Sequence, residues 1–188
     1  MDKAPDTGDI SQLVTEQRLR SDAAASWLLL DGSAETPKDF DKAYQLAVAG
    51  ARLDCAHSKG VLARCYLTGR GVAKNGTEGM RLARESAAFG SCYGHFVLGV
   101  AHVNGEGWAV QDAAEAVSHW KLAAAHGLAC AQYNLGAMYG AGQGTTQDCN
   151  EAIRLYGLAA AQGYSSAYYS LGYVAENGLG VPVDVSRA

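Results

Sequence analysis

Apolar, small and glycine positions recur along this chain with a period of about 36 residues. A leucine followed by a small residue starts the pattern at Leu62-Ala63, Leu98-Gly99, Leu135-Gly136 and Leu171-Gly172. A Gly-x-Gly triplet begins seven residues after each leucine, at Gly69, Gly105, Gly142 and Gly178. The intervals between triplets are 36, 37 and 36 residues. A fixed period of this size indicates stacked supersecondary repeats, which present extended surfaces to other molecules.

The segment after each triplet has the pattern of a capped helix. An Asp or Asn follows the last glycine by four or five residues, at Asn75, Asp112, Asp148 and Asp184. Its side chain can accept hydrogen bonds from the amides of a first helical turn. Fifteen residues later comes a glycine, which can end a helix in the left-handed conformation, at Gly90, Gly127 and Gly163. We predict a helix of about 14 residues here, with a stripe of small residues on one face.

The segment before each triplet predicts a second kind of helix. A small residue is followed four residues later by the leucine, and a mostly aromatic column comes four residues after that, at Tyr66, His102, Tyr139 and Ala175. Offsets of four place these residues on one helical face. Each repeat is therefore predicted to be a pair of antiparallel helices, and the fold class to be an all-α solenoid of stacked pairs.

One stretch carries a family resemblance especially clearly. Residues 131–139 (AQYNLGAMY), the triplet 142–144 and the helix pattern of 148–163 resemble the Sel-one-like repeat (SLR) family, a relative of the tetratricopeptide repeats. The resemblance extends over residues 39–184 and implies a right-handed α-solenoid. It also implies a non-catalytic scaffold or adaptor that binds a protein or peptide segment. Gly79, Thr145 and Ala175 depart from the usual residues of the family, which predicts looser packing there.

The pattern divides the chain into three parts. Residues 1–10 are predicted to be a disordered leader, and 11–54 a capping helix followed by a degenerate repeat whose second helix is capped by Asp39. Residues 55–188 hold the repeats, at 55–90, 91–127, 128–163 and a partial 164–188. The last repeat lacks most of its second helix, which leaves an apolar face near Leu171 and Val174. Two explanations stay open: the chain is a fragment, or a partner or second copy covers this face.

Composition narrows the classes of partner. The 188 residues are 48% hydrophobic and carry a formal net charge of −4, which disfavours nucleic acid. No apolar run approaches the roughly 20 residues that span a bilayer, so we expect no membrane insertion. Five cysteines occupy different repeat columns, so no recurring pair predicts a disulfide, and a reducing, cytoplasmic location is expected. A secreted, thiol-rich effector is the alternative.

Catalytic and metal-binding motifs are weak in this sequence. The triplets lack the Gly-Lys-Ser/Thr of a phosphate loop, which favours simple turns. Cys92, His95 and His102 can share a helical face, but paired, closely spaced zinc ligands are missing. We therefore expect no metal, no cofactor and no enzymatic activity. The alternative is that the chain is a repeat-domain fragment or regulatory subunit of a larger enzyme or membrane-associated complex.

The first helix of each repeat carries a second set of four positions, separated by three, four and three residues. We call this set the stripe. Its members are His57, Gly60, Arg64 and Leu67, then Tyr93, Phe96, Val100 and Val103, then Cys130, Tyr133, Ala137 and Gly140, then Ser166, Tyr169, Tyr173 and Glu176. In related two-helix solenoids these positions line the concave face.

Aromatic rings on the stripe, with asparagines beside them, predict a peptide groove in which the rings face solvent and the asparagines hold the ligand backbone. The predicted partner-binding residues are Tyr93, Phe96, Asn104, Tyr133, Tyr169, Tyr173 and Asn177. The alternative for Tyr133 and Tyr169 is that they recur because helices pack on them.

Overall fold

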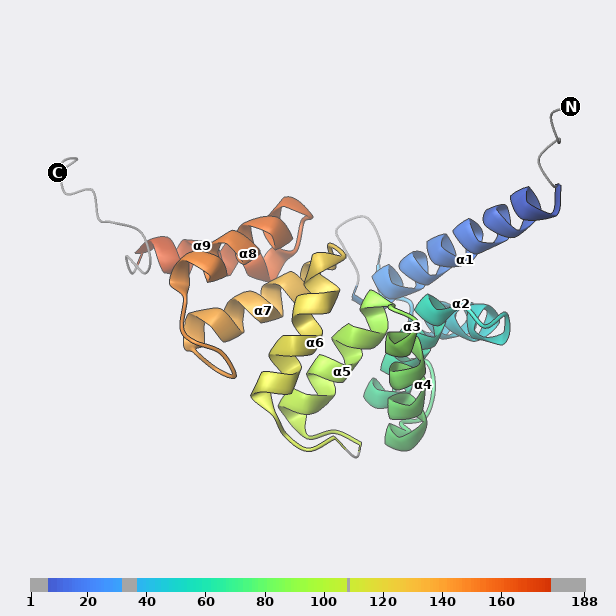
Figure 1. The fold of residues 1–188 in the computed structure, drawn as a ribbon, viewed down its shortest axis with the longest axis horizontal. Coiled ribbons are helices and arrows are strands. Elements are labelled where there is room, and N and C mark those ends of the chain that lie inside the picture. The colour runs from blue at the N-terminus through green and yellow to red at the C-terminus, as the bar shows by residue number, and fades with distance from the viewer. Residues whose placement is uncertain (1–6, 32–36, 108, 177–188) are drawn as a thin grey trace, which may run out of the picture. The chain divides into compact units, whose positions relative to one another are not determined.

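The computed structural model describes residues 7–31, 37–107 and 109–176, and its regular structure there is entirely helical (Figure 1). The helices are α1 (Thr7–Asp31), α2 (Phe40–Arg52), α3 (Ala56–Thr68), α4 (Gly76–Ala88), α5 (Cys92–Asn104), α6 (Ala113–Ala125), α7 (Ala129–Ala141), α8 (Cys149–Ala161) and α9 (Ser165–Glu176). Within these ranges no strand occurs, and the all-α prediction is confirmed.

The predicted helix caps are present. Asp39, Asn75, Asp112 and Asp148 precede α2, α4, α6 and α8, and each side chain accepts hydrogen bonds from backbone amides of the first turn. The glycines that follow α4, α6 and α8 have φ values of 72°, 82° and 81°, as the left-handed termination requires. Each capped helix is 13 residues long, close to the predicted 14. Asp184 lies outside the described residues.

The second glycine of a triplet makes a close backbone approach. Gly71 has φ +72°, and a Cβ placed on it would lie 2.3 Å from the carbonyl oxygen of Phe40 at the start of α2. Gly144 has φ +66°, and its Cβ would lie 2.2 Å from the carbonyl oxygen of Ala113 at the start of α6. Both conditions exclude a larger residue. The triplets at residues 69–71 and 142–144 are therefore turns that pack one repeat against the preceding one.

The N-terminal helix is longer than the sequence predicted. α1 begins at Thr7, whereas the pattern placed the start of the helix at residue 11. Residues 7–10 lack apolar periodicity, so the sequence alone predicts no helix there. A helix that is already nucleated extends by one backbone hydrogen bond per added residue, so it continues without an apolar face. Residues 1–6 of the predicted leader lie outside the described residues.

Contacts divide the chain into two compact units, residues 1–97 and 98–188, called here the first and the second unit. In the first unit α1 packs on α2 and α3, α2 on α3, and α3 on α4. In the second unit α6 packs on α7, α7 on α8, and α8 on α9. Each unit therefore consists of consecutive helices that pack in pairs.

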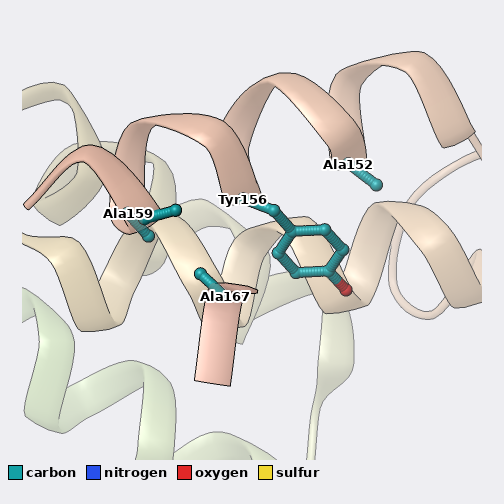
Figure 2. Close-up of a cluster of buried hydrophobic side chains, with 5 residues drawn as sticks. Ala152, Tyr156, Ala159 and Ala167 are labelled. Carbon is teal, nitrogen blue, oxygen red and sulfur yellow. The ribbon is translucent and has the colours of Figure 1, made fainter. Parts of the chain in front are cut away.

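Small residues bring the helices of each unit into close contact. In the first unit, a Cβ on Gly60 of α3 would lie 2.7 Å from the backbone nitrogen of Gly94. In the second unit, a buried cluster consists of Ala152, Tyr156, Ala159, Ala160 and Ala167. Figure 2 shows three of these side chains projecting from one side of α8, with Ala167 of α9 beside them. Close approach of this kind maximises dispersion contacts between helix backbones.

Candidate functional site

The stripe of the first unit is covered by Trp27, a residue of α1. The Trp27 ring stacks on Tyr93 with centroids 4.7 Å apart and meets Phe96 edge-on at 5.2 Å. Only 4% of Trp27 is exposed, and Tyr93 and Phe96 are 9% and 6% exposed. Stacked and edge-to-face geometries are the favourable ones for aromatic rings. The three rings therefore form a closed aromatic core.

Arg64, also a stripe residue, lies against the same ring. Its guanidinium carbon is 4.3 Å from the centre of the Trp27 ring. Its Nη1 donates a hydrogen bond to Asp31 Oδ2 at 3.0 Å, and its Nη2 donates to Asp31 Oδ1. The two bonds form a bidentate pair between α3 and the last residue of α1, so Trp27 is held by a stacked ring on one side and a cation on the other.

The expectation that Tyr93 and Phe96 face solvent is wrong, because α1 supplies Trp27 to cover them. In the sequence, the first half of the degenerate repeat, which forms α1, shows no residues that match the stripe positions. Nothing in the repeat columns indicated that an indole from α1 would reach α5. A role for Tyr93 and Phe96 in partner binding stays a prediction, and it would require that Trp27 first move away.

The stripe of the second unit borders a cleft instead. The cleft has a volume of about 450 Å³ and lies among α7, α8 and α9. It is called here the α9 cleft and is lined by Ala137, Gly140, Ala141, Cys149, Ala152, Tyr156, Tyr169, Ser170, Tyr173 and Val174. Four of these are stripe positions, namely Ala137, Gly140, Tyr169 and Tyr173. The stripe therefore lines part of an opening in this unit.

Two tyrosines form the exposed wall of the α9 cleft. Tyr169 is 79% exposed and Tyr173 is 54% exposed, and both project from α9. Tyr168, the neighbour of Tyr169, is 58% exposed but does not line the cleft. Tyrosine combines a rigid apolar ring with a hydroxyl, which makes it a frequent anchor of interfaces. Tyr169 and Tyr173 thus have the chemistry of a binding wall, and Tyr168 offers a natural comparison.

The cleft exists because small residues meet where the first unit has a large one. In the first unit, Leu67 of the stripe fills the space above Gly79, and a Cβ on Gly79 would lie 2.7 Å from Leu67 Cγ. The same columns in the second unit hold Gly140 and Ala152, and a Cβ on Gly140 would lie 3.7 Å from the Cβ of Ala152. Two small side chains leave a volume that the leucine otherwise fills.

Tyr156 and Ser170 are polar residues of the cleft lining whose hydroxyls interact with each other. Burial raises the pKa of the Tyr156 phenol above its ordinary value, and the neighbouring Tyr133 raises it further, while a hydrogen bond with Ser170 lowers it. The phenol therefore stays neutral at physiological pH. No residue of the lining carries a formal charge, so the cleft is an uncharged surface of rings and small side chains.

The remaining predicted residues lie elsewhere. Tyr133 is half-buried, and its ring centre lies 5.6 Å from Tyr156 and 5.2 Å from Tyr164, which supports the packing alternative for this position. Asn104 is the exposed last residue of α5 and does not line the α9 cleft. Asn177 lies outside the described residues. Of the predicted residues that the structure describes, Tyr169 and Tyr173 meet at the α9 cleft, whereas Tyr93 and Phe96 meet in the buried core around Trp27.

Among the cleft residues that carry a hydroxyl or thiol, sequence reasoning missed three. Cys149 and Tyr156 come from α8, and Ser170 comes from α9 beside Tyr169. Tyr156 occupies a structural column that holds Ala83 and Trp120 in the other repeats, so its size was visible but its exposure to a cleft was not. The sequence signal that could have indicated the cleft is Gly140, which stands in the stripe column that holds Leu67 in the first unit.

Among the described residues no group of three His, Cys, Asp or Glu side chains is placed to hold a metal ion. All five cysteines carry thiols. Burial raises the pKa of the Cys65 thiol to about 11, which keeps it protonated. The centre of the His102 ring stacks on that of His119 at 5.8 Å, and its Nδ1 lies 3.1 Å from the carbonyl oxygen of Val110.

None of the described helices has the length and apolar character needed to cross a bilayer.

Comparison with known proteins identifies the repeat. The Sel1 repeat profile matches residues 22–55, 61–90, 92–128, 131–164 and 165–188. No curated protein matches the chain. A protective antigen of uropathogenic Escherichia coli with an SLR fold is 28% identical, with a TM-score of 0.65 over 95% of this chain. A Sel1 repeat protein from Oxalobacter formigenes is 24% identical, with a TM-score of 0.64 over 87% of this chain, which is a likeness of fold.

The chain spans 38% of the Escherichia coli protein and 66% of the Oxalobacter protein. The profile matches cover most of the sequence and include residues 22–55, where the columns are degenerate. They agree with the helix pairs, caps and glycine turns described above. The chain belongs to the Sel1 repeat family.

Proposed function

We propose that this chain is a non-catalytic adaptor whose second unit binds a segment of a partner protein in the α9 cleft. Sel1 repeat proteins generally serve as scaffolds for protein–protein interaction. The observation that carries the proposal for this chain is the pair Tyr169 and Tyr173, two largely exposed rings at the wall of a 450 Å³ cleft. Exposed aromatic rings beside a concavity are typical of interface anchors rather than of a merely solvated face.

Size and chemistry of the cleft support a peptide-sized ligand. Binding sites for small ligands and side chains usually measure about 300–1,000 Å³ and are mostly apolar with a few polar groups. The α9 cleft falls in this range, and its polar lining groups are the hydroxyls of the tyrosines and Ser170 and the thiol of Cys149. Nothing in this lining resembles a nucleophile paired with a base, which favours binding over chemistry.

A selection of peptide ligands tests the proposal. Random dodecapeptides displayed on phage would be selected against the full chain, and the enriched peptides would then be measured by fluorescence anisotropy. Tyr169→Ala combined with Tyr173→Ala should weaken their binding roughly thirtyfold or more, because losing a central anchor costs about 2 kcal/mol. Tyr168→Ala serves as the matched control and should leave the Kd unchanged.

The circular dichroism spectrum and unfolding midpoint of each variant establish that the fold is intact. Peptides that bind the folded double variant as tightly as the natural chain would place the binding surface elsewhere and refute the proposed site. A selection that yields no peptide with a Tyr173-dependent Kd would do the same.

A further inference from the structure

We infer, resting on the proposed function, that the α9 cleft recognises an uncharged aromatic side chain of its partner, seated as Trp27 is seated in the first unit. The chain contains its own example of an aromatic residue on the stripe. Trp27 is delivered by a helix that packs on α3, and its ring meets stripe residues of α3 and α5. The first unit thus demonstrates which kind of side chain two successive stripes accommodate.

Equivalent repeat positions relate the Trp27 binding site of the first unit to the α9 cleft. Arg64 and Phe96, which contact Trp27, occupy the third and second stripe columns. In α7 and α9 those columns hold Ala137 and Tyr169, and both line the cleft. A flat ring lying over the small Ala137 side chain can stack against a tyrosine, as Trp27 does against Tyr93. The two sites therefore share the second and third stripe columns, whereas the first column, Tyr93 in α5, holds Ser166 in α9 and lies outside the cleft lining.

The chemistry of the lining defines which side chains are accepted. Ala137, Gly140, Ala141 and Ala152 leave room, and the tyrosine rings offer faces for stacking. The Tyr156 phenol is hydrogen-bonded to Ser170, so it does not require a polar ligand. A lysine or glutamate entering this lining would lose hydration without meeting an opposite charge. An indole or phenol ring would bury its apolar face and keep its polar edge at the opening.

One difference between the two sites predicts a difference in the ligand. In the first unit Asp31, four residues after Trp27, pairs with Arg64. The Arg64 column holds Ala137 and Tyr173 around the α9 cleft, so no guanidinium is present in the lining to pair with an acid. The partner therefore needs the aromatic residue but gains nothing from an acidic residue four positions later. This separates the inferred recognition from a copy of the α1 contact.

Cys149 provides a direct probe of occupancy, because its thiol belongs to the lining and is partly exposed. The experiment uses the full chain with N-acetyltryptophanamide, N-acetyltyrosinamide, N-acetylleucinamide and N-acetyllysinamide as probes. The rate of Cys149 alkylation is followed by peptide-resolved mass spectrometry, with Cys55 of the first unit as the internal control. Mass action predicts about sixfold slowing of Cys149 at a probe concentration of about five times its Kd.

The aromatic amides should protect Cys149 at millimolar concentration, and the lysine amide should not. Gly140→Leu, which places a side chain like Leu67 in the cleft, should abolish the protection, and Tyr173→Ala should weaken it. Tyr168→Ala should leave it unchanged. Equal protection by the lysine and tryptophan amides would overturn the inference. So would protection of Cys55 in parallel with Cys149.

The outcomes also separate this inference from the proposed function. If no aromatic amide protects Cys149 while selected peptides without aromatic residues bind in a Tyr173-dependent way, the aromatic preference is wrong and the adaptor function stands. If the rate of Cys149 alkylation falls as the protein concentration rises, with no probe present, a second copy of the chain occupies the cleft. If Leu179→Asp alone changes the Cys149 rate, residues 177–188 occupy the cleft. Either of the last two results overturns the inference.

Discussion

The two units use the same stripe of the first helix in opposite ways. In the first unit Trp27 covers it, and the ring contacts leave Tyr93 and Phe96 less than one tenth exposed. In the second unit the stripe borders an open cleft, where Tyr169 and Tyr173 are more than half exposed. The comparison teaches that aromatic residues at equivalent repeat positions are core or surface according to what the neighbouring helix brings to them.

The largest difference in unfolding free energy is expected between substitutions of Trp27 and of Tyr173. Trp27→Ala should lower the free energy of unfolding by about 3–5 kcal/mol, because it removes a buried aromatic side chain and leaves a cavity. Tyr173→Ala in the second unit should change it by less than about 0.5 kcal/mol, as exposed substitutions usually do. Urea denaturation monitored by circular dichroism measures both. Similar losses in the two variants would contradict the distinction between a closed and an open stripe.

The stripe glycines sharpen the comparison. A Cβ on Gly60 would lie 2.7 Å from the backbone nitrogen of Gly94 and 2.8 Å from Tyr93 Cβ, so Gly60→Ala should destabilise the chain by about 1–3 kcal/mol. A Cβ on Gly140 would make ordinary contacts at 3.7 Å or more. Gly140→Ala should therefore stabilise by about 0.5–1 kcal/mol through helix propensity. Unfolding midpoints that shift in the same direction would refute the packing difference.

Ion pairs should also differ between the two units, with smaller changes in the free energy of unfolding. The pair of Arg64 and Asp31 joins two helices and is largely shielded, with side chains 14% and 29% exposed. A double-mutant cycle with Arg64→Met and Asp31→Asn should give a coupling energy of about 1–2 kcal/mol.

The matched control is Arg154 with Glu151, a pair within α8 whose side chains are 57% and 30% exposed. Arg154 lowers the pKa of Glu151, but solvent screening should limit the coupling to about 0.3–0.5 kcal/mol. Because the carboxylate pKa is lowered, this contribution is present above the ordinary pKa of glutamate and is lost as the pH falls. Equal couplings in the two cycles would remove the distinction.

The last effect, smaller than that of the Arg64–Asp31 pair, concerns a buried thiol of the first unit. Burial raises the pKa of Cys65 from 9.0 to about 11. Stability from this group is complete below pH 9 and falls as the pH rises toward 11, because the unfolded thiol ionises first. The loss should reach roughly 0.8 kcal/mol at pH 9.5. Urea denaturation at pH 7 and 9.5 should show a smaller change for Cys65→Ala than for the natural chain, and an unchanged difference would contradict the shift.

Local features of the sequence were sufficient for the helices and their ends. Residue type and spacing predict caps at Asp39, Asn75, Asp112 and Asp148, and each of these four accepts the expected backbone hydrogen bonds. Glycines such as Gly71 and Gly163 were predicted as left-handed turns, and both have positive φ. These features depend on residues within one or two helical turns of each other, so periodicity reports them directly. The repeat also identified the family.

Only the tertiary structure decided which stripe residues are buried and which are exposed. Trp27 lies in a helix without clear repeat columns, and its contacts with Arg64 and Tyr93 join segments far apart in the sequence. The α9 cleft likewise depends on two small residues, Gly140 and Ala152, meeting across two helices. Helical periodicity fixes the face on which a side chain lies. Whether that face is buried depends on the volume of side chains supplied by other helices, which no local pattern contains.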